Sequence, residues 1–298
     1  MAPGILATQV LGKNMNGLSR RDFLKTAACG SAALLASDIL FAEESNVRNA
    51  PMNKDALIID SHIHIPSPGW NGHTSFFSSQ DAAIRYLRDA GIGGAIFTTW
   101  QGVFSKTAED LFAANEDALK LAKTYKGFLL PGANVNPLFF EESQDWLSRF
   151  SDEGHKWVGE LIIIDDAVPY ASAKFMKLFE ICAKHNHIVQ LHQHHDIIKI
   201  AESFPDMKIV CAHIPPKEVM QKLCNLKNVW LDMSGMSGGL IIGQLELALE
   251  LFGHKRLLFG TDFDGYEPRA FIARVKSVVK KKDEQEDIFK NNLIRLLA

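Results

Sequence analysis

The feature that most constrains the fold is a repeated alternation of short apolar runs with longer segments of helical periodicity. It begins near residue 56 and occurs eight times before the C-terminus. Apolar runs followed by amphipathic helices indicate parallel strands joined by helical crossovers. The expected strands cover residues 56–65, 94–100, 127–135, 157–164, 187–192, 208–213, 228–234 and 256–263.

The segments between these strands carry signals for helix starts and stops. "TAEDLFAANEDALKLAKTY" opens with a Thr-x-x-Asp cap, and Leu111, Asn115 and Leu119 share one helical face. "DAAIRYLRDAG" ends at Gly91, a residue type that favours a helix C-terminus. Eight strand–helix units over about 250 residues predict an α/β fold, a (β/α)8 TIM barrel in a single domain. An open doubly wound sheet is the alternative, but no G-x-G-x-x-G follows the first strand.

The N-terminal part of the chain has a different character. "SRRDFLK" (19–25) is followed by "TAACGSAALLA", a basic segment before an apolar one, as in export signals. The apolar segment is too short to span a bilayer, so no stable membrane anchor is expected. We therefore expect residues 1–42 to be an export signal with a short linker, 43–55 to be the N-terminal linker of the mature chain, and 56–298 to form the barrel.

The paired arginines Arg20 and Arg21, followed by Phe23, Leu24 and Lys25, resemble a twin-arginine signal. This resemblance implies a bacterial protein delivered to the periplasm, or exported, by the twin-arginine machinery. Such a route carries a folded chain, so a metal could be loaded in the cytoplasm.

The charge and the cysteine content of the chain limit the kinds of partner and of structural site that it can have. The formal net charge is -3 and no long Lys/Arg run occurs, which argues against a protein that binds nucleic acid. Cys182, Cys211 and Cys224, the cysteines after the signal, form neither a disulfide framework nor zinc-finger spacing. A small-molecule substrate is the expected partner, and the chain could also form a homo-oligomer.

The first expected strand, "ALIIDSHIHI", carries polar residues at alternate positions. Because side chains alternate across a strand, Asp60, His62 and His64 should point to the same side. A His-x-His pair at a strand end presents two imidazoles that can bind one metal ion. We expect Asp60 to support the strand or to orient a ligand.

Further polar residues occur at the ends of other expected strands. They are His192, His213 and Asp262 directly after apolar runs, and Glu160 inside "WVGELIII". Buried unpaired, such groups would cost several kcal/mol each. Gathered around a divalent cation at the C-terminal mouth of a barrel, they would have a function. Imidazole and carboxylate ligands suit zinc, our first choice, but also manganese, iron or nickel.

The order of these residues resembles the amidohydrolase superfamily, in particular its amidohydrolase-related (amidohydrolase 2-like) branch of metal-dependent hydrolases and decarboxylases. The resemblance covers most of the chain after the signal. It implies that His62, His64, His192 and Asp262 bind the metal. His213 would lie beside the metal-bound water or the substrate, and would itself be a ligand in a two-metal enzyme.

Glu160 lies where the superfamily divides. In "GEL" it looks like the glutamate of TatD-type nucleases, which bridges two ions. The alternative is an inner-barrel carboxylate that bonds a neighbour or a metal-binding histidine. We slightly prefer one metal over two.

The expected reaction is hydrolysis of an amide, lactone or other ester bond in a small substrate. The metal would activate a water molecule, Asp262 would carry its proton to the leaving group, and His213 would stabilise the oxyanion. The alternatives are non-oxidative decarboxylation of a small carboxylic acid, a TatD-like binuclear phosphoesterase, and a non-catalytic periplasmic binding protein. A missing ligand would favour the last.

Aromatic residues after the first two strands have two interpretations. Trp70, Phe76, Phe77, Trp100 and Phe104 could form an apolar wall above the metal, or could pack on the barrel rim.

Overall fold

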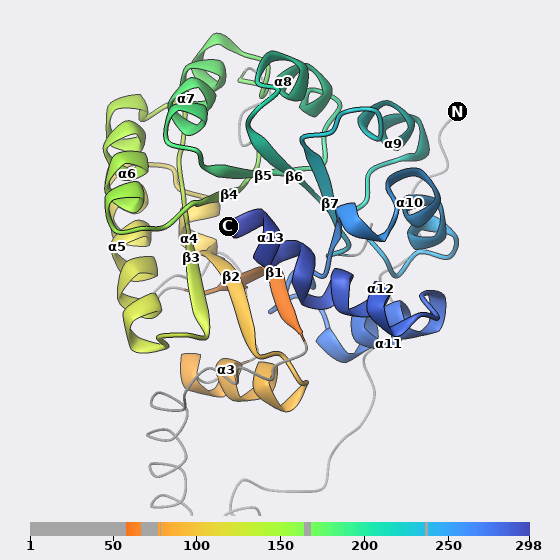
Figure 1. Cartoon of the computed structure of the whole chain (residues 1–298). Coiled ribbons are helices and arrows are strands. Elements are labelled where there is room, and N and C mark those ends of the chain that lie inside the picture. The colour runs from red at the N-terminus through yellow and green to blue at the C-terminus, as the bar shows by residue number, and fades with distance from the viewer. Residues whose placement is uncertain (1–57, 67–76, 78, 164–167, 236–237) are drawn as a thin grey trace, which may run out of the picture. The chain divides into compact units, whose positions relative to one another are not determined.

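A computed structural model describes residues 58–66, 77, 79–163, 168–235 and 238–298. The predicted export signal, the linker, and the loop residues Trp70 and Phe76 lie outside these ranges. In the described part, parallel strands follow one another around one sheet in the order β1 to β8, with most of the helices outside them (Figure 1). The predicted (β/α)8 barrel is confirmed.

Each strand coincides with a predicted apolar run. The strands are β1 (Ile59–Ile65), β2 (Gly94–Thr99), β3 (Leu129–Ala133), β4 (Trp157–Leu161), β5 (Ile188–His192), β6 (Lys208–Ala212), β7 (Val229–Asp232) and β8 (Leu257–Leu258). The last is much shorter than the predicted 256–263, because regular pairing with β7 ends at Leu258.

The residues after β8 run beside β1 and link the two ends of the sheet. Ser61 N–H donates to the Phe259 carbonyl at 2.8 Å, and Asp262 N–H donates to the His62 carbonyl at 2.8 Å. Ile63 and Phe263 also pair as an isolated parallel bridge. These bonds bring Asp262 next to the polar end of β1.

The helices begin and end close to the predicted signals. Thr107 Oγ1 accepts from Asp110 N–H at the start of α5, as its capping sequence predicts. Gly91, just beyond the end of α3, has a φ of 91°. The described helices are α3 (Gln80–Asp89), α4 (Trp100–Val103), α5 (Ala108–Thr124), α6 (Phe140–Asp152), α7 (Ala173–Lys184), α8 (Ile197–Ser203), α9 (Lys217–Leu223), α10 (Gln244–Phe252), α11 (Pro268–Val278), α12 (Lys282–Glu286) and α13 (Asn292–Leu297), with a 3-10 turn at His254–Arg256 and a π-helical segment at Asp287–Asn291.

The C-terminal helix α13 covers one end of the barrel (Figure 1). Leu293 and Leu296 pack on the buried side chains of Trp157 and Ile188 at the start of β4 and β5. Lys208 Nζ, at the start of β6, donates to the Leu296 carbonyl at 2.6 Å. This closes the N-terminal end of the strands, so the C-terminal ends remain as the open mouth.

Two further observations concern the chain as a whole. No helix among the described residues combines the length and apolar character needed to cross a bilayer. Cys182, Cys211 and Cys224 are free thiols. Burial raises the pKa of Cys182 and Cys211, so both remain protonated at neutral pH.

Candidate metal centre at the barrel mouth

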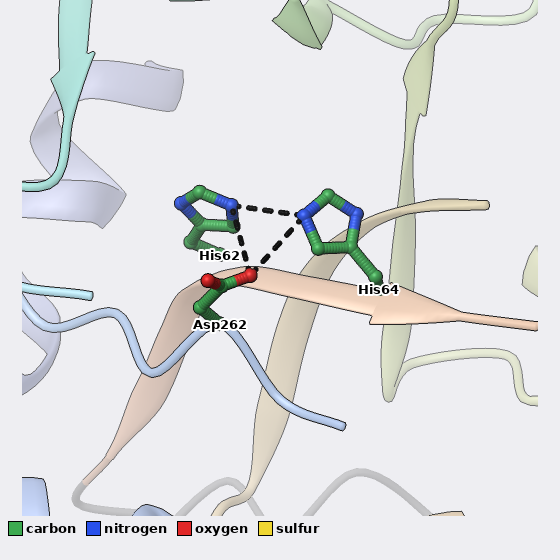
Figure 2. Close-up of side chains that lie close together, drawn as sticks. All are labelled: His62, His64 and Asp262. Carbon is green, nitrogen blue, oxygen red and sulfur yellow. Dashed lines mark hydrogen bonds and ion pairs between the residues drawn. The ribbon is translucent and has the colours of Figure 1, made fainter. Parts of the chain in front are cut away.

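Three predicted ligands meet at the C-terminal end of β1. His62 Nε2 lies 3.1 Å from His64 Nε2. Asp262 Oδ1 lies 3.8 Å from His62 Nε2 and 3.4 Å from His64 Nε2. Figure 2 shows the three donor atoms turned toward one another. The structure thus brings His62, His64 and Asp262, which the sequence proposed as ligands, into one compact group.

A second group of donors stands at the ends of β4, β5 and β6. His192 Nδ1 lies 2.7 Å from Glu160 Oε1, and His213 Nε2 lies 3.3 Å from the same oxygen. The structure thus places His192 in one group with Glu160 and His213.

Glu160 stands between the two groups. Its Oε2 atom lies 3.3 Å from His62 Nε2 and 3.4 Å from His64 Nε2, while Oε1 faces the second group. From this position Glu160 could bind one metal ion or bridge two ions.

Partners behind the cluster orient the two histidines of β1. Asp232 Oδ2, at the end of β7, lies 3.1 Å from His62 Nδ1, and Thr98 Oγ1 lies 3.0 Å from His64 Nδ1. Partners of this kind leave the Nε2 atoms free to bind a metal. Sequence reasoning missed Asp232, although it directly follows the apolar run "NVWL", the same signal that identified Asp262.

Asp60 contacts the segment after β8 and the backbone of His62. Its carboxylate accepts from Thr261 Oγ1 at 2.6 Å, from Thr261 N–H at 3.1 Å and from His62 N–H at 3.0 Å. The β1–β2 register shifts between Asp60 and Ile63, which breaks the simple alternation expected from the sequence. Burial raises the pKa of Asp60 to about 7. Asp60 therefore supports the strand, one of the two roles predicted for it.

Two residues of the cluster have left-handed backbones. His213 has a φ of 62° and Asp262 a φ of 61°, a region that non-glycine residues rarely occupy. His213 N–H is held by Asp232 Oδ1 at 3.0 Å. A Cβ atom at the neighbouring Gly235 would lie 2.5 Å from His213 Nδ1, so only glycine fits beside this imidazole.

Two carboxylates beside the histidines, Glu160 and Asp232, have lowered pKa values that favour their charged form. Burial alone would raise the pKa of Glu160, but the charge of His62 and hydrogen bonds from the other histidines hold it well below its usual range. Burial opposes ionisation of Asp232 in the same way, yet His62 lowers its pKa to about 2. Conversely, Glu160 and Asp232 raise the pKa of His62 well above its usual value despite its burial.

This donor set fits a divalent metal ion. It offers imidazole nitrogens and carboxylate oxygens, the ligands common to zinc, manganese and iron sites. Among the described residues, Asp262 Oδ1 is a buried oxygen that makes no hydrogen bond, although it faces both histidines of β1. A cation between these atoms would satisfy that oxygen and balance the buried negative charge.

A cavity of about 380 Å³ opens above the cluster. Its polar lining includes Glu160, His192, His213 and Asp262, and its apolar lining includes aromatic side chains and Ile162. Among the described lining residues there is no lysine or arginine. A substrate in this cavity therefore meets the donor cluster at one end and apolar surface elsewhere.

The aromatic residues divide between the two predicted roles. Trp100 lines the cavity and stacks on His64 with ring centroids 4.0 Å apart, while Phe104 stacks on Trp100 at 5.8 Å. Phe77 instead packs against Tyr86 and Phe263 on the rim. The wall interpretation thus holds for Trp100 and Phe104, and the packing interpretation for Phe77.

Replacing Asp232 with asparagine should weaken metal binding by about 10- to 100-fold, the usual effect of losing a partner behind a ligand. An asparagine NH2 group at the Oδ2 position would donate to His62 Nδ1 and force the proton onto Nε2, the metal-facing nitrogen. Titration calorimetry with Mn²⁺ or Zn²⁺ measures the change. Asp206→Asn, at an exposed position, is the control, and equal affinities in the two variants would contradict the assigned role of Asp232.

Comparisons with known proteins concern the fold and the family of the chain. No curated protein matches the chain. The solved structures that resemble it have a sequence identity so low that they show the fold alone. A 2,6-dihydroxybenzoate decarboxylase from Rhizobium is 14% identical, covers 80% of this chain and 98% of its own, and has a TM-score of 0.66.

Two further solved structures of similar fold are also decarboxylases. A dihydroxybenzoic acid decarboxylase from Polaromonas, with bound manganese and the inhibitor 2-nitroresorcinol, is 14% identical over 80% of this chain and 96% of its own, with a TM-score of 0.65. A 5-carboxyvanillate decarboxylase from Sphingomonas paucimobilis is 12% identical over 80% of this chain and 98% of its own, with a TM-score of 0.63.

A family model described as amidohydrolase (Amidohydro_2) matches residues 59–298, which includes the whole barrel and every residue of the donor cluster. This chain therefore belongs to the Amidohydro_2 family of amidohydrolases.

Proposed function

We propose that the protein is a metal-dependent enzyme that removes CO2 from a small aromatic carboxylic acid. The observation that carries this proposal is the cavity of about 380 Å³, which places aromatic walls directly above a cluster of histidines and carboxylates. This reverses the order of the sequence-based expectations, in which hydrolysis came first and decarboxylation second.

The cavity chemistry supports an aromatic acid. The ring of the substrate would pack against Trp100 and Phe104, since stacked aromatic pairs are favourable beyond the area they bury. Because the described lining contains no lysine or arginine, the substrate carboxylate would be drawn to the end of the cavity where His213 lies, since Glu160 raises the pKa of that imidazole despite its burial. A divalent ion held by the cluster would supply further positive charge there and polarise the bound acid.

The reaction requires a proton donor for the ring carbon. The bond between that carbon and the carboxylate breaks, its electron pair stays on the ring carbon, CO2 leaves, and the carbon takes up a proton. Asp262 lines the cavity and is tied through its backbone to His62, which fixes its place in the cluster. We assign to Asp262 the transfer of this proton.

The choice of metal follows from the cluster and from the structural neighbours. The donors do not distinguish manganese from zinc. Because the Polaromonas structure holds manganese, Mn²⁺ is the first ion to load.

The position of Glu160 favours a second candidate function, a two-metal hydrolase. Its two oxygens face separate donor groups, as a bridging carboxylate would. A phosphoester would then be the substrate class to examine first. Elemental mass spectrometry of metal-loaded protein decides between the candidates: one equivalent per chain supports the decarboxylase, and two equivalents that fall to one in Glu160→Ala support the hydrolase.

The proposed reaction is tested directly with Mn²⁺-loaded protein. We expect CO2 release from at least one member of a panel of benzoic acids substituted with hydroxyl and methoxy groups, and none from metal-free protein. A parallel panel of aryl esters, lactones and amides measures hydrolysis. Hydrolytic turnover without CO2 release from any acid would contradict the decarboxylase and restore the hydrolase.

A further inference from the structure

A second, smaller cavity adjoins the one above the metal cluster. Its volume is about 20 Å³, and its lining includes the last residues of β4 and residues that follow β2 and β3. Val103, Glu160 and Ile162 line both cavities, so the small cavity is a side compartment that borders the main one. Glu160 therefore faces both the main cavity and this compartment.

The side chain of Asn134 is the unusual feature of this compartment. Only 2% of the residue is exposed, yet neither Oδ1 nor Nδ2 has a hydrogen-bond partner among the described residues. A buried amide without partners destabilises the folded state, so each such group in a native structure calls for a reason, and binding of a ligand is one such reason.

The backbone of Asn134, in contrast, is held on both sides. Its N–H donates to Asn115 Oδ1 at 2.9 Å, and its carbonyl accepts from Asn115 Nδ2 at 2.9 Å. A buried side chain of α5 thus fixes the backbone of Asn134 while leaving its amide unused. The backbone of Asn134 is therefore held in place, while its side-chain amide keeps its hydrogen-bonding capacity unused.

The helix beside the compartment leaves room for this amide. A Cβ atom at Gly102 in α4 would lie 2.2 Å from both Cγ and Nδ2 of Asn134. Only glycine allows the side chain to lie where it does. Gly102→Ala would consequently displace the amide without removing it.

A neighbouring asparagine shows the ordinary structural use of this residue type. Asn136 Nδ2 donates to the Ser105 carbonyl at 3.1 Å, and Asn136 Oδ1 accepts from Leu138 N–H at 2.9 Å. Asn136 therefore stabilises the loop after β3. The same loop contains Asn134, whose amide has no such task.

We propose that Asn134 is a specificity-determining residue that binds a single hydroxyl group of the substrate in the side compartment. A site needs roughly 10–15 Å³ to hold one water-sized group, so about 20 Å³ accepts one oxygen and excludes a carboxylate or phosphate. A hydroxyl both donates and accepts, so it can pair with either atom of the amide. The inference rests on the proposed function and narrows its substrate to a hydroxylated aromatic acid.

The test measures binding rather than turnover. Benzoate and its 2-, 3- and 4-hydroxy derivatives are titrated into Mn²⁺-loaded wild-type protein and into the Asn134→Leu and Gly102→Ala variants by calorimetry. We expect at least one hydroxybenzoate to bind wild-type protein about tenfold more tightly than benzoate, the gain from one well-made hydrogen bond. Both variants should lose that difference and bind benzoate as wild-type protein does.

The controls separate this inference from the proposed function. Asn225→Leu, at an exposed position that lines neither cavity, should keep the wild-type preference, and thermal melting checks the fold of each variant. A preference that survives in Asn134→Leu would overturn the assignment, as would an ordered water on Asn134 that remains when hydroxybenzoate is bound. Failure of benzoate and of all its derivatives to bind wild-type protein would overturn the proposed function together with this inference.

Discussion

Replacement of His62 with alanine is expected to abolish stoichiometric metal binding and, with it, all catalysis. His62 is fully inside the cluster, with Nε2 within 3.1–3.3 Å of His64 and Glu160. Loss of a partner behind a ligand weakens metal binding about 10- to 100-fold, so loss of the ligand itself should exceed 100-fold. The variant also leaves Asp232 without the charge that stabilises it.

Elemental mass spectrometry after loading with Mn²⁺ measures this effect. The wild-type protein should retain metal through gel filtration and His62→Ala should not. His185→Ala serves as the matched control, because His185 belongs to none of the donor groups found among the described residues. Retention of a full equivalent by His62→Ala would place the metal elsewhere and would overturn the assigned centre.

Replacement of Asp262 with asparagine should lower kcat by about 100- to 10,000-fold, the usual contribution of a positioned acid or base. The asparagine oxygen can still face the histidines of β1, so part of the metal affinity should remain. The carboxamide cannot carry the proton that the ring carbon takes up. Rates are compared at saturating Mn²⁺, so that weaker metal binding does not imitate a catalytic defect.

Asp264→Asn is the neighbouring control for this experiment. Asp264 Oδ1 accepts from Trp100 Nε1 at 2.9 Å, and an asparagine can accept the same hydrogen bond. We expect nearly wild-type rates in this variant. If Asp262→Asn kept wild-type kcat at saturating metal, Asp262 would not carry the proton, and His213 would be the next candidate on the cavity wall.

Most of the barrel was predictable from local patterns. Buried parallel strands are continuous apolar runs, and amphipathic helices with caps such as Thr107 mark the crossovers, so element type and order follow from short stretches of sequence. The exception is β8, which is shorter than predicted. After it, hydrogen bonds from Ser61 N–H to the Phe259 carbonyl and from Asp262 N–H to the His62 carbonyl replace regular strand pairing. Those bonds are long-range and have no local signature.

The candidate ligands were also predictable by type and place, because polar residues that end apolar runs collect at one mouth of the barrel. The sequence did not predict which of these ligands lie next to one another. His213 and Asp262 have left-handed backbones, and the partners of their N–H groups are far away in the sequence: His213 N–H donates to Asp232 Oδ1 and Asp262 N–H donates to the His62 carbonyl.

The sequence by itself thus determined a (β/α)8 barrel with histidines and carboxylates at the strand ends, since both follow from periodicity and burial. Only the tertiary structure decided that His192 lies with Glu160, that Trp100 stacks on His64, and that Asn134 is left unsatisfied beside the cavity. The physical reason is that hydrogen bonds and ring contacts act over a few ångströms between residues far apart in the chain, and local propensity does not encode such distances.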